Sequence, residues 1–415
     1  MQVLFLHQNF PGQYRHLAAA MAARPGTRVI GLGQNETPAI PGVTQMRYKP
    51  PEPGQTAPHP YLVRTENHIR HGQAAARAAL QLRDKGFRPN IICAHPGWGE
   101  ALFLRDVFPD AKLILYWEYY FRAQGGDIGF DPPGVPVGLD DAARTRVQNT
   151  IQLLQLEAAD WGVSPTRWQW SRYPEWARAR ISVIHEGIDT GIATPDGPAE
   201  FRLPDGRLLT REHEVATYVA RNLEPYRGFP QFMRALPIIQ RQRPQAQIVI
   251  VGGDGISYGR APAEGGNWRE LMLGEMEGKL DLSRLHFVGR LPYAQLLSLF
   301  RLTRAHLYLT YPFVLSWSML DAMACGAAIL ASATAPVQEV IEDGVNGRLV
   351  DFFDHQAIGE ALGNMLANPE AQTHLKSAAR AHVLKHYDLA GICLPQQLKM
   401  LDSIAAGQPG PVVEA

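Results

Sequence analysis

Short apolar runs rich in β-branched residues alternate along the chain with longer segments whose apolar positions have a helical period. The runs that predict strands are 3–7, 28–32, 90–94, 112–117 and 181–184 in the first half, and 215–219, 247–251, 285–288, 305–309 and 328–331 in the second. Nearly continuous apolar strands separated by helices are typical of parallel sheets covered on both faces. The pattern predicts an α/β protein with two Rossmann-like, doubly wound domains.

The boundary between the two predicted domains is marked by proline and glycine, which favour turns and linkers. These residues lie in the stretch 188–214 and are Pro195, Gly197, Pro198, Pro204 and Gly206. We expect a first domain at 1–190, a linker with an edge hairpin at 191–213, a second domain at 214–385, a C-terminal helix at 386–405 and a flexible tail at 406–415.

Two further segments interrupt the alternation of strands and helices. The proline-rich stretch 35–60 predicts an irregular surface loop. The stretch 119–140 is rich in glycine, proline and aspartate and follows a strand end, where ligands of open parallel sheets bind. It is either a functional loop or an inert insertion, and the sequence leaves both interpretations open.

Charge balance and cysteine usage narrow the class of protein. Lys+Arg and Asp+Glu number 40 each, which argues against a dedicated nucleic-acid binder. The scattered Cys93, Cys325 and Cys393 predict neither a disulfide framework nor a zinc site, and they favour a reducing, cytoplasmic setting. No apolar run approaches the roughly 20 residues of a membrane span, so we expect a soluble protein, with peripheral docking on the inner membrane still compatible.

Two strand ends in the first half carry candidate site residues. The first strand runs into Gln-Asn-Phe-Pro-Gly-Gln-Tyr at 8–14, where Gly12 leaves room for a phosphate near a helix N-terminus. A glycine in such a turn more often serves the backbone geometry alone. His95 ends the third strand beside Gly97 and Gly99 and either binds a ligand hydroxyl or is a structural histidine.

The strand ends of the second half carry positive charge and glycine. Arg221 follows a strand and Arg227 precedes a helix, and two guanidinium groups at the mouth of a parallel sheet suit a diphosphate. Gly252 and Gly253 end the next strand and permit a ligand to approach closely, although the full dinucleotide fingerprint is missing.

The most informative block covers residues 308–326 and reads Tyr-Leu-Thr-Tyr-Pro-Phe-Val-Leu-Ser-Trp-Ser-Met-Leu-Asp-Ala-Met-Ala-Cys-Gly. It predicts a strand, a loop and a helix that begins near Ser316, whose free N–H groups can hold a phosphate. Asp321 lies one to two turns into that helix, where a carboxylate can accept two ribose hydroxyls. Its apolar flanks argue against an ordinary surface acid.

At these residues the chain resembles the retaining glycosyltransferases of family 4, which have the GT-B fold. Arg221 matches the family's arginine and Arg227 stands for its lysine. The segment 321–326, Asp-Ala-Met-Ala-Cys-Gly, matches the family's second acidic residue and the small apolar residues after it, and 339–347, Glu-Val-Ile-Glu-Asp-Gly-Val-Asn-Gly, matches the last motif. The block His-Gln-Asn-Phe-Pro-Gly-Gln-Tyr-Arg-His at 7–16 is similar to one subgroup, found among bacterial polysaccharide-assembly transferases.

The resemblance implies a cleft between two domains, a C-terminal helix that crosses back to the first domain, and roles for named residues. Arg221, Arg227 and His95 would act in catalysis on the donor's diphosphate and sugar. The donor would also contact Gly12, Gly252, Gly253, Phe313, Val314, Leu315, Ser316, Asp321 and Glu339. Glu339 is expected near a helix start, where an acid also has a purely structural role.

The sequence departs from the family at one important position. Phe313 lies where the first glutamate, which usually contacts the donor sugar, is expected, and Asp321 is one methylene shorter than the second glutamate. The resemblance implies retention of the anomeric configuration. Because no residue is a safe covalent nucleophile, we favour front-face attack, in which the arginines stabilise the leaving diphosphate. No Asp-x-Asp motif occupies a convincing site, so we expect no metal and no other cofactor.

The acceptor is expected to bind the first domain, through Trp98, Tyr119 and Trp168. An aromatic and basic segment at 161–180 and an arginine stripe (Arg64, Arg70, Arg77 and Arg83) either bind sugars or an anionic membrane surface, or are core aromatics and solvated charges.

The resulting hypothesis is a metal-independent hexosyltransferase that moves a hexose, guessed to come from a UDP-hexose, to a glycan or lipid-linked acceptor in polysaccharide synthesis. The alternatives are a non-catalytic nucleotide-sugar binder and a nucleotide-sugar epimerase, and Phe313 disfavours the epimerase because such chemistry needs acid–base carboxylates at the sugar.

Overall fold

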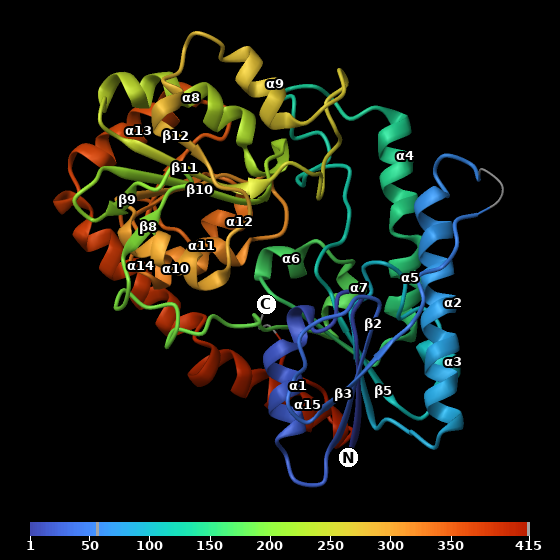
Figure 1. The fold of residues 1–415 in the computed structure, drawn as a ribbon. Coiled ribbons are helices and arrows are strands. Elements are labelled where there is room, and N and C mark those ends of the chain that lie inside the picture. Colours follow the sequence, from blue (N-terminus) through green and yellow to red (C-terminus); the bar gives the residue numbers. More distant parts are fainter. Residues whose placement is uncertain (55–57, 413–415) are drawn as a thin grey trace. The chain divides into compact units, whose positions relative to one another are not determined.

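The computed structural model describes residues 1–54 and 58–412. The chain forms two compact units (Figure 1): unit 1 comprises Met1–Gly187 together with Ala390–Ala415, and unit 2 comprises Ile188–Leu389. Unit 1 is therefore discontinuous in sequence, because the chain returns to it after completing unit 2.

Unit 1 is built on a seven-stranded parallel sheet with the order β3-β2-β1-β4-β5-β6-β7. The strands are β1 (Gln2–Leu6), β2 (Arg28–Gly33), β3 (Val43–Arg47), β4 (Ile91–Ala94), β5 (Lys112–Tyr116), β6 (Trp161–Ser164) and β7 (Ile181–Val183). The strand order reverses between β1 and β4, and this reversal is where ligands of such sheets bind.

Helices cover both faces of this sheet, as its buried central strands require. They are α1 (Arg15–Ala22), α2 (Val63–Asp84), α3 (Leu104–Val107), α4 (Leu139–Gln148), α5 (Thr150–Ala158), α6 (Arg167–Ser171), α7 (Glu175–Arg178) and α15 (Leu394–Ala405), with a turn η1 (Gly12–Tyr14) before α1 and a π-helical turn η5 (Leu389–Cys393) before α15. One core joins the sheet to α1 and α15, and the other joins it to α2, α3 and α5.

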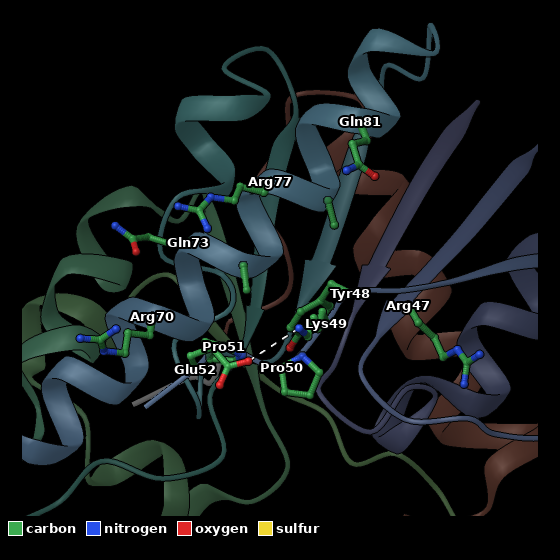
Figure 2. Close-up of a pocket in the computed structure, with 12 residues that line it drawn as sticks. Arg47, Tyr48, Lys49, Pro50, Pro51, Glu52, Arg70, Gln73, Arg77 and Gln81 are labelled. Atoms are coloured by element: carbon green, nitrogen blue, oxygen red, sulfur yellow. Dashed lines mark ion pairs between the residues drawn. The ribbon is translucent and has the colours of Figure 1, made fainter. Parts of the chain in front are cut away.

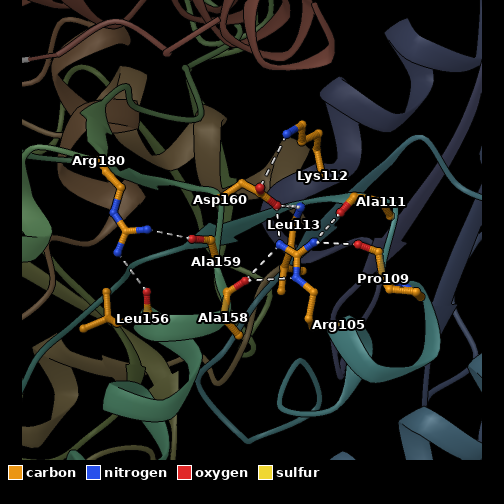
Figure 3. A network of polar contacts seen from close by, with 10 residues as sticks. All are labelled: Arg105, Pro109, Ala111, Lys112, Leu113, Leu156, Ala158, Ala159, Asp160 and Arg180. Atoms are coloured by element: carbon orange, nitrogen blue, oxygen red, sulfur yellow. Dashed lines mark hydrogen bonds and ion pairs between the residues drawn. The ribbon is translucent and has the colours of Figure 1, made fainter. Parts of the chain in front are cut away.

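A polar network ties the amino-terminal ends of β5 and β6 together (Figure 3). The Arg105 guanidinium donates to the carbonyls of Ala158 (2.9 Å) and Ala111 (2.8 Å) and pairs with Asp160. Asp160 also accepts from the N–H of Leu113 at 2.8 Å. This network lies at the strand ends opposite the ligand-binding edge. We therefore infer that it stabilises unit 1 and does not bind a ligand.

Unit 2 is built on a six-stranded parallel sheet with the order β12-β11-β10-β13-β14-β15 and a separate hairpin of β8 and β9. The strands are β8 (Glu200–Arg202), β9 (Leu208–Thr210), β10 (Val215–Asn222), β11 (Gln247–Gly253), β12 (Leu285–Phe287), β13 (Ala305–Tyr308), β14 (Ile329–Ser332) and β15 (Arg348–Val350). The strand order reverses between β10 and β13, so this edge is the second expected ligand site.

The helices of unit 2 bury their apolar faces on this sheet and on each other. They are α8 (Phe229–Gln242), α9 (Trp268–Glu275), α10 (Tyr293–Leu302), α11 (Trp317–Ala324), α12 (Ala335–Gln338), α13 (His355–Ala367) and α14 (Thr373–His386), with turns η2 (Pro225–Arg227), η3 (Leu282–Arg284) and η4 (Glu370–Gln372). Helices α8 and α13 approach so closely that a Cβ on Gly359 would lie 2.8 Å from Ile238.

The predicted fold class is confirmed, and each of the ten predicted strands coincides with an observed one. The expectation of a wholly irregular segment at 35–60 is wrong, because β3 lies within it; residues 55–57 of that segment fall outside the described residues. In the tail, the carbonyl of Pro411 accepts a hydrogen bond from Ser182, and residues 413–415 fall outside the described residues.

Candidate active site

Arg227 is the central cation at the carboxyl edge of the unit 2 sheet. It ends η2, is 6% exposed, and donates from Nη1 to Tyr308 Oη (3.1 Å) and Thr310 Oγ1 (2.7 Å). Gly228 follows at φ +68°, and a Cβ there would lie 2.4 Å from that of Leu309, so the turn requires glycine. Arg221, by contrast, is exposed at the end of β10.

The start of helix α11 is connected to Arg227 through one phenol. Ser316 is the N-cap of α11, as predicted, and its N–H donates to Tyr308 Oη at 2.8 Å. Tyr308 Oη therefore accepts from both the helix start and Arg227. Val314 is buried, whereas Leu315 and Ser316 are partly exposed. A guanidinium and helix N–H groups held in one network are the groups that bind phosphate oxygens.

Asp321 is buried on α11 and accepts a hydrogen bond from Tyr293 Oη at 2.9 Å. Burial raises the pKa of this carboxyl to about 6, although the Tyr293 hydrogen bond opposes the increase. A buried carboxylate with a raised pKa is under-stabilised in its ionised form. Ligand hydroxyl groups that donate to it would supply the missing stabilisation, and the ribose role implied by the resemblance stays a prediction.

Phe313 belongs to an aromatic wall rather than to a polar sugar site. Its ring lies 5.3 Å from that of Tyr226 and 5.0 Å from that of Tyr258, in edge-to-face geometry in both cases. The Arg227 guanidinium lies 5.5 Å from the Tyr258 ring. The apolar residue at 313 is thus integrated into the packing around Arg227.

The loop after β11 is held by a residue that the sequence did not single out. Glu224 is fully buried, and its carboxylate accepts from the backbone N–H groups of Ser257 (3.3 Å), Tyr258 (3.1 Å) and Gly259 (2.9 Å). Three successive N–H groups that converge on one anion form a nest. The only feature of the sequence that could have indicated this role is the position of Glu224 between Arg221 and Arg227. An acid at such a position is equally typical of an exposed surface residue.

The two glycines at the end of β11 lie in close packing. A Cβ on Gly252 would lie 2.7 Å from Leu223, and one on Gly253 would lie 2.7 Å from Asn222 Oδ1. Asn222 Oδ1 also accepts from Arg290 Nη2 at 2.9 Å, and Arg290 is a second cation at this edge that sequence reasoning missed.

In unit 1, Gly12 lies against a histidine. It has φ +49°, and a Cβ there would lie 2.6 Å from Nε2 of His7. The positive φ and the nearby His7 ring both favour glycine at this position, and the donor role of Gly12 stays a prediction.

His95 is buried between aromatic rings at the end of β4. Its ring lies 5.5 Å from that of Tyr116 and 4.7 Å from that of Trp98, and His7 is also in contact. Nδ1 accepts from the Gly97 N–H at 3.1 Å, which leaves Nε2 directed toward Glu118 Oε2 at 3.5 Å. Gly12, His95 and Trp98 are thus brought together around His7.

The other two acceptor candidates form a separate group. Tyr119 Oη donates to Asp127 Oδ1 at 2.7 Å, and the ring of Trp168 lies 6.0 Å from that of Tyr119. Of the remaining aromatics of 161–180, Trp161 and Tyr173 are buried core residues, whereas Trp176 is exposed. Some of the aromatic residues of 161–180 are therefore core residues rather than binding residues.

The expectation that Glu339 lies near a helix start is wrong. Glu339 is the C-cap of the short helix α12, partly exposed, so it lies at the carboxyl end of the helix dipole. Among residues 1–54 and 58–412, no group of three or more His, Cys, Asp or Glu has the arrangement of a metal site. Within the same residues, no helix is both long and apolar enough to cross a membrane.

Two units that are each built on a parallel, Rossmann-like sheet are the architecture of the GT-B fold. A family described as "Glycosyl transferase family 4 group" matches residues 25–193, and one described as "Glycosyl transferases group 1" matches residues 206–382. The chain belongs to the family 4 group of glycosyltransferases.

The matches to curated relatives span only part of the length of those proteins. The chain is 24% identical over 289 residues to the D-inositol 3-phosphate glycosyltransferase of Mycolicibacterium smegmatis, which is 68% of this chain and 59% of that protein. The chain therefore spans less than two thirds of the length of this relative.

Solved structures share the fold along almost the whole chain. The sucrose-phosphate synthase of Thermosynechococcus elongatus has a TM-score of 0.71 at 18% identity, with 98% of this chain and 100% of that chain covered. HepE of Anabaena, solved in complex with UDP and glucose, has a TM-score of 0.67 at 15% identity, with 97% and 100% covered.

Proposed function

We propose that the protein is a retaining, metal-independent hexosyltransferase that uses a nucleotide-diphosphate sugar, with UDP-hexose as the first candidate. The observation that carries this proposal is the network that joins Arg227, Tyr308 and the start of α11 beside the buried carboxyl of Asp321. The network suits a diphosphate, and the carboxyl suits a ribose. The relative HepE was solved with UDP and glucose, which supports UDP as the nucleotide.

In the proposed reaction, an acceptor hydroxyl oxygen attacks the anomeric carbon on the face from which the diphosphate leaves. The bond between the anomeric carbon and the phosphate oxygen breaks as the new glycosidic bond forms. The acceptor's proton passes to an oxygen of the leaving diphosphate. Arg221, Arg227 and the N–H groups at the start of α11 stabilise the charge that grows on that group.

The acceptor is proposed to be a glycan or lipid-linked sugar in polysaccharide synthesis, bound on unit 1. A lipid-linked acceptor would bring the protein to the surface of the inner membrane from the cytoplasmic side. The relative from M. smegmatis is named for a D-inositol 3-phosphate acceptor, so a phosphorylated polyol belongs in the acceptor panel.

The direct test is calorimetric titration of nucleotide sugars into the full chain, with and without EDTA. We expect one donor to bind equally well in both conditions. Because Arg221 is exposed, Arg221→Ala leaves the fold intact and should weaken binding about tenfold, which is about 1.4 kcal/mol. Arg227→Lys tests the buried cation, and Arg241→Ala, exposed on α8, is the matched control.

Product analysis separates the alternatives. A new glycoside supports the transferase, an isomerised donor would identify an epimerase, and tight donor binding without turnover would identify a nucleotide-sugar binder. The apolar Phe313 is the observation that favours the binder. Loss of turnover in EDTA would contradict metal independence.

A further inference from the structure

The arginine stripe on α2 has different surroundings along its length. The Arg64 guanidinium lies 4.8 Å from the centre of the Phe121 ring, and Arg83 donates to the carbonyl of Val107 at 3.4 Å. These two arginines contribute to local packing within unit 1. Arg64 also lines a cavity together with Arg70, whereas Arg70 and Arg77 line a second cavity.

This cavity lies between α2 and the segment that follows β3, and its volume is about 510 Å³. Sites for small molecules in proteins commonly have about 300–1,000 Å³. The lining residues are Arg47, Tyr48, Lys49, Pro50, Pro51 and Glu52 on one side and Arg70, Gln73, Ala74, Arg77, Ala78 and Gln81 on the other.

The helix side of the cavity presents hydrogen-bond donors. Its lining positions recur at helical spacing, and each long side chain among them ends in N–H groups, with two alanines between them. Figure 2 shows Arg70, Gln73 and Arg77 extending on the same side of α2, whereas Arg47 extends away from the helix. No acid lies on this stripe of the lining.

The positive charges differ in how well they are neutralised. Arg70 donates to Glu66 at 3.0 Å through Nε and again through Nη2, so that charge is compensated. Lys49 and Glu52 form only a 3.6 Å pair whose side chains are 87% and 83% exposed, and such pairs are weak. Arg77 has no ion pair within the part of the chain that the structure describes. The surplus positive charge of the cavity is therefore at Arg77 and Lys49.

The opposite wall is held rigid. Pro50 and Pro51 fix two backbone φ angles. Tyr48 is 5% exposed and donates from Oη to Oε1 of the fully buried Glu100 at 2.9 Å. Because the wall is anchored from inside unit 1, the wall itself would lose little conformational entropy when a ligand binds there.

We propose that this cavity binds the anionic group of a saccharide, a phosphate or a carboxylate, with Arg77 as the principal cation and Gln73 as an amide donor. A guanidinium can donate two parallel hydrogen bonds to either anion, and the amide can bind an adjacent hydroxyl. Resting on the proposed function, this makes the acceptor an acidic rather than a neutral sugar.

The test uses the full chain, calorimetry and three probes in the presence of saturating UDP: glucose 6-phosphate, trigalacturonate and the neutral maltotriose. We expect at least one acidic probe to bind, with an affinity that falls as NaCl is raised, and maltotriose not to bind. Arg77→Glu should weaken binding by at least about tenfold. Gln73→Glu, which places a negative charge on the same wall, should weaken it as well.

Lys85→Glu is the control, because Lys85 is exposed at the end of the same helix and outside the cavity. Binding of neither acidic probe, or an equal loss in Arg77→Glu and Lys85→Glu, would overturn the proposal. UDP titration of the same variants reports separately on the proposed function. If UDP binds and the acidic probes do not, only the anion site fails; if the acidic probes bind in an Arg77-dependent manner without UDP affinity, only the donor assignment fails.

Discussion

Asp321 combines a buried position with the charge that its proposed ligand requires. Its pKa of about 6 exceeds the value of about 3.9 of an unfolded chain, because burial disfavours the ionised form. As pH rises from about 4 to 6, the unfolded chain loses this proton while the folded chain keeps it, so stability falls across that window. At neutral pH the buried, ionised Asp321 therefore lowers the free energy of unfolding by roughly 3 kcal/mol.

We therefore predict that Asp321→Asn raises the free energy of unfolding at pH 7.5 and leaves it little changed at pH 4. The asparagine Oδ1 can still accept the Tyr293 hydrogen bond, so the change removes the charge but not the contact. The same variant should bind the nucleotide donor more weakly. Thermal unfolding at both pH values, with donor titration at pH 7.5, measures this trade-off, and equal stabilisation at both pH values would contradict the assigned pKa.

Glu224 is predicted to hold the loop that carries Tyr258. Glu224→Gln keeps the shape but replaces an acceptor-only carboxylate with a neutral amide, which weakens hydrogen bonds from Ser257, Tyr258 and Gly259. Charge-assisted hydrogen bonds contribute about 1.5–3 kcal/mol each, so we expect the loop to open more often. Amide hydrogen exchange at 257–259 should become faster.

Glu264→Gln, an exposed acid in the same loop, is the control and should leave exchange unchanged. Unaltered exchange in Glu224→Gln would mean that the nest does not hold the loop.

Sequence reasoning found residues whose position follows from a strand end or a motif. Ser316 begins α11 as predicted, and Asp321 is buried as its apolar flanks indicated. Burial of the Arg227 guanidinium could not be predicted from the sequence, because its partners Tyr308 and Thr310 lie about 80 residues away along the chain. Contacts of that separation depend on tertiary packing that local patterns do not encode.

At the scale of elements, the Arg105–Asp160 network joins the connection before β5 to the start of β6 (Figure 3). Burial alone would raise the pKa of Asp160, but the Leu113 N–H and the Arg105 guanidinium outweigh it and hold this pKa below its usual value. The stabilisation is therefore present above the unfolded pKa of about 3.9 and is lost as pH falls through the lower folded pKa.

Asp160→Asn is predicted to destabilise unit 1 by about 1–2 kcal/mol at pH 7, because a charge-assisted hydrogen bond becomes a neutral one. The difference from the wild type should shrink as pH falls below about 4, where the wild-type carboxyl also becomes neutral. This pH dependence is opposite in sign to that of Asp321→Asn. Urea unfolding across pH measures it, and a pH-independent difference would show that the charge is not responsible.

The strands that the sequence missed have two physical causes. β3 and β15 are sheet edges with partly exposed residues, so they lack the continuous apolar run of a central strand. β6 has only four residues within an aromatic and basic segment. The other central strands were predictable, because burial of both faces gives them continuous apolar runs.

At the scale of the whole molecule, unit 1 depends on a segment that the chain supplies last. Met400, Leu401 and Ile404 of α15 are at most 3% exposed and share a core with Leu17 and Met21 of α1. Figure 1 shows α1 and α15 beside the same sheet. The amphipathic pattern predicted the helix, but its partner across the core lies almost 400 residues earlier, a separation that no local pattern reveals.

Truncation after residue 389 is predicted to unfold or severely weaken unit 1. Burial of each of the three α15 side chains contributes about 1.5–3 kcal/mol, or roughly 5–9 together, which is comparable to the whole stability of a typical domain, about 5–15 kcal/mol. The fragment 188–389 contains the complete core of unit 2 and should fold alone with a cooperative transition. Circular dichroism and thermal unfolding of fragments 1–389, 1–405 and 188–389 measure this. Fragment 1–405 retains α15 and should keep most of the stability of unit 1, whereas a 1–389 fragment as stable as 1–405 would show that the discontinuous helix is dispensable.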